Sequence, residues 1–329
     1  MPANLPPLYY EAERKYRSAK SVPERMAALQ AMMSAMPKHK GTDHLRADLR
    51  AKLARLMEEL ETPRHTSSGQ PQPFSLRKEG AGQAVLIGLP NSGKSQLLVS
   101  LTGANAKVAS YPFTTQVPLP GMLQFQNIRI QLVDTPAIVD QNMQARLFSL
   151  LRNADLLLIV VDLSTDALKQ TDENLAELEK WGYLLLGIGE APDPEDYRVQ
   201  KRAILVGNKA DEAGALDQFQ RLGARYGGQV PLVMVSPLEG VGLDELKEAI
   251  FRAMGKVRVY TRAPGGEPDY DAPIVLLQGS KVEDAAQALH KDWRRRLKYA
   301  LLWGSGKFEG QRVGRDYVLA DGDVLEFHG

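Results

Sequence analysis

The sequence predicts an α/β protein: a doubly wound, mostly parallel sheet follows a helical region and precedes a small α+β domain. Strand-like and helix-like segments alternate through the middle of the chain, which is typical of doubly wound folds. Two of those strands, Leu156 to Val161 and Ala203 to Val206, are uninterrupted apolar runs, as expected for parallel strands that are covered on both faces. After residue 256 the order changes to short strands around a single helix.

The chain divides into four predicted segments. They are an N-terminal helical hairpin region over residues 1–62, a linker over 63–80, the α/β domain over 81–256 and a last domain over 257–329. The linker is rich in Pro, Ser, Gly and Gln. Leucines spaced three and four residues apart predict an apolar stripe on the second helix, which opens near Thr42. The helices either pack on their own chain or form a contact surface for RNA or a partner.

The last domain is predicted from its strands and one helix. Ile274 to Leu277, Tyr299 to Trp303 and Val324 to Phe327 have the composition of strands. Ser280 and Glu283 have the spacing of a capping box, which predicts where the helix begins.

The composition excludes several classes of protein. The chain has 329 residues, 41 Lys and Arg against 40 Asp and Glu, and no Cys. Disulfide frameworks, zinc sites based on Cys and thiol catalysis are therefore excluded. No apolar run is long enough to span a bilayer, so no membrane partner is predicted and a cytoplasmic location is expected. With a net charge of +1, any contact with nucleic acid requires a local basic surface.

The strongest motif runs from Gly88 to Ser95, with the sequence Gly-Leu-Pro-Asn-Ser-Gly-Lys-Ser. It fits G-x-x-x-x-G-K-S and lies between a predicted strand and a predicted helix, which is the context that confirms a phosphate-binding loop. Lys94 would reach the β- and γ-phosphates, and the Ser95 hydroxyl would ligate Mg²⁺. The start of the helix adds its positive end.

A second motif, Asn208-Lys209-Ala210-Asp211, follows the apolar strand that ends at Val206. The carboxylate of Asp211 can accept hydrogen bonds from guanine N1–H and N2–H₂, and adenine has no such pair of donors. Asn208 would contact the other edge of the base and tether the loop, while the Lys209 stem would cover the ring. The motif therefore predicts guanine nucleotides, GTP and GDP, as ligands.

Three further positions complete the predicted site. Asp134 follows the Ile128 to Val133 strand and is placed to hold Mg²⁺ through water. A Thr between the phosphate loop and Asp134 can close over the γ-phosphate and complete the Mg²⁺ shell, but spacing alone does not decide between Thr114 and Thr115. Ser236 could place a backbone N–H on the guanine.

These motifs, in this order, resemble the translation-factor-like GTPases. The phosphate loop together with Tyr111-Pro112-Phe113-Thr114-Thr115 is similar to the Obg family, particularly its DRG branch. The tail resembles a TGS domain, a β-grasp module, through Val257 to Thr261 and Gly279 to Asp284. The resemblance implies a P-loop GTPase domain followed by a TGS domain, GTP hydrolysis, and a setting on the ribosome or RNA in translation or ribosome maturation. It also implies a possible protein partner for the TGS domain.

The resemblance further assigns roles to individual residues. It makes Thr115, with Ser95 and Asp134, a ligand of Mg²⁺, and it makes Lys94, Thr115 and Asn91 the catalytic group. The nucleotide-binding set is Gly88, Pro90, Asn91, Ser92, Gly93, Lys94, Ser95, Phe113, Thr114, Thr115, Asp134, Ala137, Asn208, Lys209, Asp211, Ser236 and Pro237.

Two positions depart from the family pattern, and a third differs from Ras-like enzymes. Ala137 stands where the phosphate-sensing motif normally ends in Gly, so switching at that peptide is expected to be restricted. Pro237 replaces an Ala and has no N–H to offer the base, so recognition there would depend on neighbouring groups. Ile138 stands where Ras-like enzymes have the Gln that orients water. Hydrolysis is therefore expected to be slow without a partner or a cation.

Asn91 offers one source of such a cation. Relatives with Asn at this position can hold K⁺ near the phosphates, where it would stabilise developing charge. The alternative explanation of Asn91 is loop geometry, because Asn tolerates turn conformations.

Two other functions remain open from the sequence. One is a scaffold that binds GTP or GDP with little turnover and acts through its TGS domain, and the other is an ATPase, against which Asp211 argues. For the partner, a basic run surrounds Trp293 and could bind RNA; it consists of Lys291, Arg294, Arg295, Arg296 and Lys298. A solvated helix face with a buried Trp explains the same run.

Overall fold

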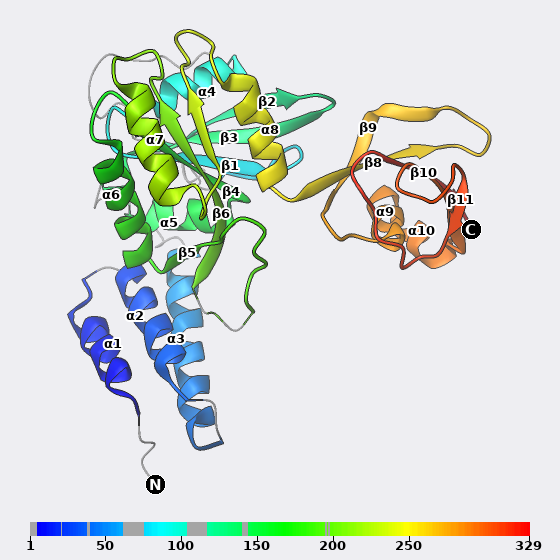
Figure 1. The fold of residues 1–329 in the computed structure, drawn as a ribbon. Coiled ribbons are helices and arrows are strands. Elements are labelled where there is room, and N and C mark those ends of the chain that lie inside the picture. The colour runs from blue at the N-terminus through cyan, green and yellow to red at the C-terminus, as the bar shows by residue number, and fades with distance from the viewer. Residues whose placement is uncertain are drawn as a thin grey trace, which may run out of the picture. The chain divides into compact units, whose positions relative to one another are not determined.

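The computed structural model describes residues 5–20, 22–37, 40–61, 76–103, 117–139, 144–194, 196 and 198–329. The chain forms two compact units, labelled by element in Figure 1. The larger unit contains residues 1–122 and 131–249, and the smaller contains residues 123–130 and 250–329. In these described ranges, no helix is both long and apolar enough to cross a membrane.

Three helices form the N-terminal part: α1 (Pro7–Ser18), α2 (Val22–Ala35) and α3 (Asp43–Glu61), with a 3₁₀ turn, η1 (Lys40–Thr42), before α3. The sequence predicted a pair of helices, and α1 is additional. It begins at a proline, whose missing N–H costs nothing in a first helical turn.

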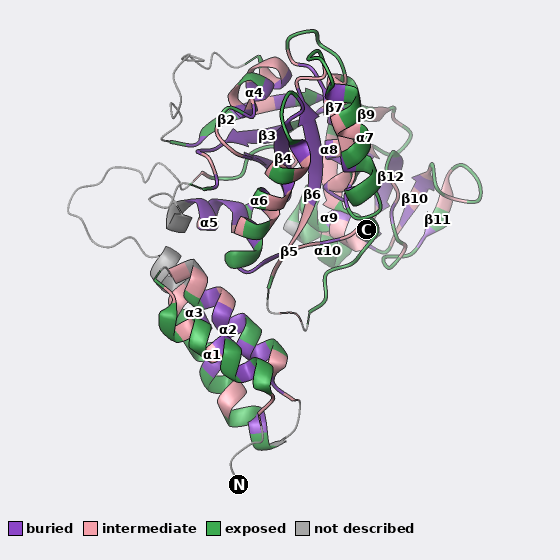
Figure 2. Cartoon of the chain, turned by 60° about the vertical axis from the view of Figure 1, so that its left-hand side comes forward, coloured by how far each residue is buried: buried purple, intermediate pink, exposed green. Residues whose placement is uncertain are grey.

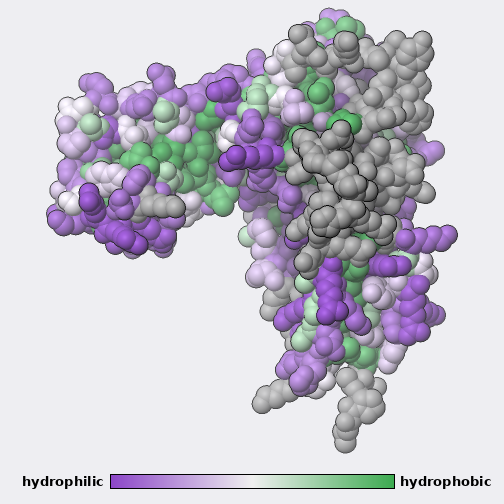
Figure 3. Space-filling model, turned by 180° about the vertical axis from the view of Figure 1, so that it is seen from behind, coloured by the Kyte–Doolittle hydropathy of each residue, from purple (hydrophilic) through white to green (hydrophobic). Residues whose placement is uncertain are grey.

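The N-terminal helices share one apolar core with the α/β part of the larger unit. Met26, Leu29 and Met33 of α2 belong to the same cluster of buried side chains as Phe148 and Trp181. The helices therefore pack on their own chain, which is one of the two alternatives that the sequence left open. Figure 3 shows hydrophilic side chains (purple) interspersed with hydrophobic ones (green) on the visible face of the molecule.

Within the described ranges, the sheet of the larger unit has the strand order β2-β3-β1-β4-β6-β5, with β7 also beside β6. Its strands are β1 (Gln83–Ile87), β2 (Leu119–Phe125), β3 (Ile128–Asp134), β4 (Leu156–Asp162), β5 (Tyr183–Leu185), β6 (Val199–Asn208) and β7 (Leu232–Val235). Strand β1 pairs in parallel with β3 and β4, and β6 pairs in parallel with β4, β5 and β7. The predicted doubly wound, mostly parallel sheet is confirmed.

Helices connect the strands and cover the sheet. They are α4 (Lys94–Thr102), α5 (Gln144–Asn153), α6 (Ala167–Lys180), α7 (Ala215–Tyr226) and α8 (Leu243–Ala253). Figure 2 shows the central strands as buried (purple) and the outer helix faces as exposed (green). Every residue of β1 and β4 is buried, which agrees with the apolar runs from Ala84 to Ile87 and from Leu156 to Val161.

The direction of the strands places the site. The chain passes from β1 to β3 on one side and then to β4 on the other, so β1 lies at the point where the strand order reverses. In open α/β sheets, ligands bind beyond the carboxyl ends of the strands at such a point. The loop from Gly88 to Gly93 begins there.

The smaller unit contains a sheet with the order β11-β10-β12-β8-β9. The strands are β8 (Lys256–Arg262), β9 (Pro268–Leu277), β10 (Tyr299–Trp303), β11 (Gln311–Val313) and β12 (Asp323–His328). Strand β12 is parallel to β8, and the other neighbours are antiparallel. Helices α9 (Val282–Leu289) and α10 (Lys291–Arg296) follow β9, and α9 shares its core with the sheet. The expected small α+β module is confirmed.

The start of α9 differs by one residue from the prediction. The helix begins at Val282, and the backbone N–H of Lys281 donates to the Asp284 carboxylate at 2.8 Å. The return bond of the capping box therefore comes from Asp284, and the predicted pair Ser280 and Glu283 was wrong.

A close contact fixes α2 against the turn between α6 and β5. Gly182 in that turn has φ +78°, and a Cβ there would collide with the side chain of Gln30 and lie 3.3 Å from Ala27. Gly189 also has a positive φ, +77°, but nothing lies within 4 Å of its Cβ position. A comparison of the two glycines therefore distinguishes the cost of left-handed backbone, which both share, from the cost of crowding, which only Gly182 would meet.

We expect Gly182→Ala to lower the free energy of unfolding more than Gly189→Ala. Both variants force alanine into left-handed backbone, at about 1–2 kcal/mol, and Gly182→Ala adds overpacking of roughly 1–3 kcal/mol. Urea denaturation of both variants measures the difference. Equal losses would contradict the packing of α2 described above.

Candidate functional site

The loop after β1 holds the amino group of Lys94 through its backbone carbonyls. Lys94, at the start of α4, is buried, and its Nζ donates to the carbonyl oxygens of Gly88 at 3.1 Å and Leu89 at 2.9 Å. Burial lowers the pKa of Lys94 to about 8, opposed by the nearby Asp134 carboxylate. Asn91 in this loop has φ +63°, a left-handed conformation that Asn tolerates better than most residues.

Ser95 and Asp134 meet beside this loop. The Ser95 hydroxyl donates to the Asp134 carboxylate, although Ser95 lies in the first turn of α4 and Asp134 ends β3. Leu86 of β1 pairs with Asp134 of β3, and the Thr135 hydroxyl donates to the Leu86 carbonyl at 2.6 Å. This pairing holds the carboxylate at the edge of the sheet where the phosphate loop begins.

Asn208 ties the second motif to the phosphate loop. Its Nδ2 donates to the Ser92 carbonyl at 2.9 Å, and only 2% of the residue is exposed. Gly93 has φ +88°, and a Cβ at this position would collide with Asn208 Nδ2. The contact between the two loops therefore requires glycine at position 93.

Asp162 was missed by the sequence analysis. It ends β4, opposite Asn208 of β6, and accepts a hydrogen bond from Lys209 Nζ. Burial alone would raise the pKa of Asp162, but hydrogen bonds from Lys209 and Ser164 outweigh it and hold the pKa below its ordinary value. This bond fixes the direction of the Lys209 side chain. A side chain that covers a base needs such a fixed direction. A carboxylate directly after the apolar run was the available signal.

Ser236 contacts the predicted base-reading carboxylate. Its hydroxyl donates to Asp211, and the backbone N–H of Ala210 donates to the Val235 carbonyl at 3.0 Å. The ends of β6 and β7 are thereby held together. Ser236 was predicted to offer its backbone, but that N–H donates to Val241 O at 3.0 Å.

Ala137 and Ile138, two of the unusual positions in the sequence, both lie among the described residues. Ala137 is partly exposed and has a negative φ, so its Cβ introduces no backbone strain in this conformation. Ile138 is completely buried in the apolar core, and its side chain has no polar group to offer a ligand. The predicted residues Phe113, Thr114 and Thr115 lie outside the described residues.

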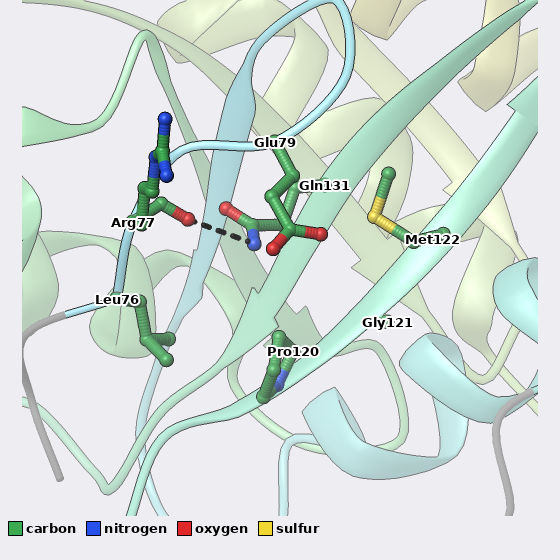
Figure 4. Close-up of a pocket in the computed structure, with 7 residues that line it drawn as sticks. All are labelled: Leu76, Arg77, Glu79, Pro120, Gly121, Met122 and Gln131. Carbon is green, nitrogen blue, oxygen red and sulfur yellow. Dashed lines mark hydrogen bonds between the residues drawn. The ribbon is translucent and has the colours of Figure 1, made fainter. Parts of the chain in front are cut away.

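A separate surface pocket lies near the amino end of β1. It has a volume of about 240 Å³ and is lined by Leu76, Arg77, Glu79, Pro120, Gly121, Met122 and Gln131 (Figure 4). Gln131 Nε2 donates to the Arg77 carbonyl at 3.2 Å. Because Gln131 pairs with the first residue of β1, this pocket is not part of the cluster at the carboxyl ends.

The residues at the carboxyl ends fit a nucleotide and a divalent cation. Ser92 Oγ and Asn208 Oδ1 are buried and have no hydrogen-bond partner among the described residues. Buried polar atoms of this kind are expected to pair with a ligand or water. The Ser95 hydroxyl and Asp134 carboxylate are adjacent oxygen donors, the type that Mg²⁺ prefers.

Comparison with known proteins agrees with this arrangement. Residues 83–186 match the family model described as 50S ribosome-binding GTPase, and residues 257–328 match the TGS domain. A GTP-binding protein from Pyrococcus horikoshii has the same general fold, with a TM-score of 0.53 and 17% identity. The alignment covers 75% of this chain and 99% of that structure. The fold and the site thus define a guanine-nucleotide-binding GTPase domain joined to a TGS domain.

The family is shown by relatives along most of the chain. The developmentally-regulated GTP-binding protein 1 of Xenopus laevis is 31% identical, over 92% of this chain and 97% of its own length. The developmentally-regulated GTP-binding protein 2 homolog of Dictyostelium discoideum is 30% identical, over 92% and 98%. The chain belongs to the developmentally-regulated GTP-binding protein (DRG) family, as the motifs predicted.

We expect Gly93→Ala to weaken GDP binding at least about tenfold, because the added methyl group must displace Asn208 from the phosphate loop. Gly103→Ala is the matched control, since Gly103 has φ +66° but nothing within 4 Å of its Cβ position. Titration with a fluorescent GDP analogue measures both variants. Equal affinities would show that the contact between the loops is not needed for binding.

Proposed function

We propose that this protein is a GTP-hydrolysing switch that works in the cytoplasm, with the ribosome or another RNA as its partner. The observation that carries the proposal is the hydrogen bond between Asn208 and the Ser92 carbonyl. It joins a phosphate loop to a guanine-reading motif and so creates one site for both ends of a nucleotide. Membership of the DRG family supports the same activity.

In the proposed reaction, water attacks the γ-phosphate of GTP, the bond to the β–γ bridging oxygen breaks, and GDP and phosphate leave. Lys94 and the backbone N–H groups of its loop bind the phosphates. Ser95, Asp134 and Thr115 would hold Mg²⁺, which neutralises charge on the β- and γ-phosphates when bound. The backbone N–H of Ala137 would donate to the γ-phosphate and sense its loss.

Slow intrinsic hydrolysis is part of this proposal. The buried Ile138 cannot orient the attacking water, so the stabilisation must come from elsewhere. A K⁺ ion held by Asn91 could supply it by balancing charge on the leaving oxygens. The left-handed backbone at Asn91 is equally explained by loop geometry, and a variant can separate the two explanations.

We expect phosphate release from GTP to be at least about tenfold faster in KCl than in NaCl. Asn91→Gly keeps access to φ +63° but removes the side-chain amide, so it should abolish this difference. Phosphate release in both salts tests wild type and variant. Equal rates in the two salts, or K⁺ stimulation that survives in Asn91→Gly, would contradict a role for Asn91 in holding K⁺.

The second candidate function is a scaffold that binds GTP or GDP with little turnover and acts through its TGS domain. The burial of Ile138 favours the scaffold, because a buried, apolar side chain at position 138 cannot orient the attacking water. Absence of phosphate release, even with K⁺ and ribosomes, would favour the scaffold over the switch.

The proposed RNA contact is better supported on the open face of the C-terminal sheet than on α10. The open face is the side of the sheet away from the core, and it carries Tyr299, Trp303, Arg312 and His328. Trp293 of α10 packs against the core of the smaller unit, with its ring centroid 6.0 Å from that of Phe327. This agrees with a solvated helix face that carries a largely packed Trp, so Trp293 is a poor platform for a stacked base. Figure 3 shows that hydrophobic side chains (green) also reach the surface of the C-terminal unit, among hydrophilic ones (purple).

The open face instead carries aromatic rings beside arginines. Tyr299 and His328 stack with ring centroids 4.7 Å apart, and the Arg312 guanidinium lies 3.9 Å from the Tyr299 centroid. On the same face, the Arg262 guanidinium lies 4.4 Å from the Trp303 centroid. Planar cations and rings of this kind bind phosphates and stack on unpaired bases.

We expect the protein to co-sediment with ribosomes more strongly with a non-hydrolysable GTP analogue than with GDP. Arg312→Ala removes an exposed cation from the open face and should weaken this binding several-fold. Arg315→Ala is the control of equal charge, since Arg315 instead contacts Glu283 and the Arg294 carbonyl. Absence of sedimentation in both nucleotide states would remove the ribosome from the proposal and leave GTP binding intact.

A further inference from the structure

The hairpin formed by β2 and β3 is divided between the two compact units. Its tip, Leu123–Ile130, belongs to the smaller unit, while residues 119–122 and 131–134 belong to the larger unit. Strand β3 therefore begins in the smaller unit and ends at Asp134, the predicted Mg²⁺ ligand. One continuous strand thus joins the C-terminal unit to the proposed nucleotide site.

Hydrogen bonds hold the tip of the hairpin within the smaller unit. Asn127 Nδ2 donates to the hydroxyl oxygen of Tyr260 at 2.7 Å and to the carbonyl oxygen of Tyr270 at 2.8 Å. Next to it, Gln126 Oε1 accepts a hydrogen bond from the guanidinium of Arg258. The side-chain amides of both residues at the turn therefore contact the C-terminal unit.

An aromatic contact adds to these hydrogen bonds. The rings of Phe125 and Phe251 stack with centroids 5.2 Å apart, and both residues are buried. The Arg258 guanidinium lies 4.9 Å from the centroid of the Phe251 ring. Because stacked, buried rings contribute free energy beyond the area that they bury, the tip is held firmly rather than as a free turn.

The tip covers one part of the open face of the C-terminal sheet. Side chains alternate along β8, and Val257 and Val259 belong to the core, so Tyr260 and Arg262 lie on the open face. Tyr260, which accepts from the tip, is buried with 7% of the residue exposed. Arg262 follows on the same face and lies over Trp303, in the part proposed to bind RNA. The tip and the proposed RNA contact are therefore neighbours on one face.

The other end of β3 is held at the nucleotide site. Every residue from Ile130 to Asp134 is buried, and β3 pairs with β1 from Gln131 to Asp134. A paired strand in a close-packed interior shifts as a unit, because such an interior does not deform continuously. A displacement of Asp134 on loss of the γ-phosphate would therefore reach the tip.

We propose that the β2–β3 hairpin couples the nucleotide held at Asp134 to the open face of the C-terminal sheet, so that this face binds RNA more tightly in the GTP state than in the GDP state. This inference rests on the proposed function and names the element that joins its two sites. Coupling between two binding sites is reciprocal. Bound RNA must then tighten GTP binding, relative to GDP, by the same factor.

The test measures the affinity for a fluorescein-labelled oligouridylate of about twelve nucleotides, with GDP or with a non-hydrolysable GTP analogue bound. We expect the wild-type protein to bind this RNA at least about fivefold more tightly in the analogue state. Asn127→Ala removes both hydrogen bonds of its amide and should bring the ratio of the two affinities close to one. Tyr260→Phe removes one of these bonds and should lower the ratio in part.

Gln124→Ala is the matched control in the same hairpin. Gln124 is exposed, and its amide donates to the Gln126 carbonyl within the hairpin, so this variant should keep the wild-type ratio. All variants should bind GDP like the wild type in the absence of RNA, which shows that the nucleotide site is intact.

Equal RNA affinities in the two nucleotide states of the wild type would overturn the inference, as would a ratio that survives in Asn127→Ala or falls equally in Gln124→Ala. If neither state binds the oligouridylate, the proposed RNA partner fails. Hydrogen exchange at the backbone N–H groups of β8 then decides the coupling alone. A difference between nucleotide states that Asn127→Ala abolishes supports the coupling, and identical exchange in both states overturns it.

Discussion

The site depends on one geometric constraint: parallel strands end at the same edge of the sheet. Strands β1, β3, β4, β6 and β7 each end in a polar loop, and the parallel pairing brings those loops together. Residues as far apart as Ser92 and Asn208 then form a direct hydrogen bond of 2.9 Å. Without that alignment, a phosphate loop and a base-reading loop would be two unrelated turns. The buried strands hold this edge of the sheet in place.

Much of the fold and the centre of the site could be predicted because their signals are local. The phosphate loop, Asp134 and the segment from Asn208 to Asp211 each follow a predicted strand, and that order is visible in a sequence. Strand β5 has three residues, too few for a periodic pattern, and was not predicted. The helix α1 has one strong local signal, its opening proline, and was not separated from its neighbours.

The supporting contacts could not be predicted because they join residues distant in the chain. Lys209 contacts Asp162 and Ser236 contacts Asp211 across strand ends, and no spacing rule relates these positions. Trp293 is a residue for which the sequence left two explanations open. A basic run around an aromatic resembles an RNA-binding motif in sequence, but packing against Phe327 gives the ring a structural role. Aromatic residues at the surface can be recognised only when the sheet faces are known.

We infer that the strand ends form one site for a guanine nucleotide. Calorimetric titration of the protein with GDP and with ADP, in the presence of Mg²⁺, tests it most directly. We expect one GDP to bind per chain, at least about a thousandfold more tightly than ADP, because Asp211 can accept from donors on guanine that adenine lacks. Equal affinities for GDP and ADP, or no binding of GDP, would contradict it.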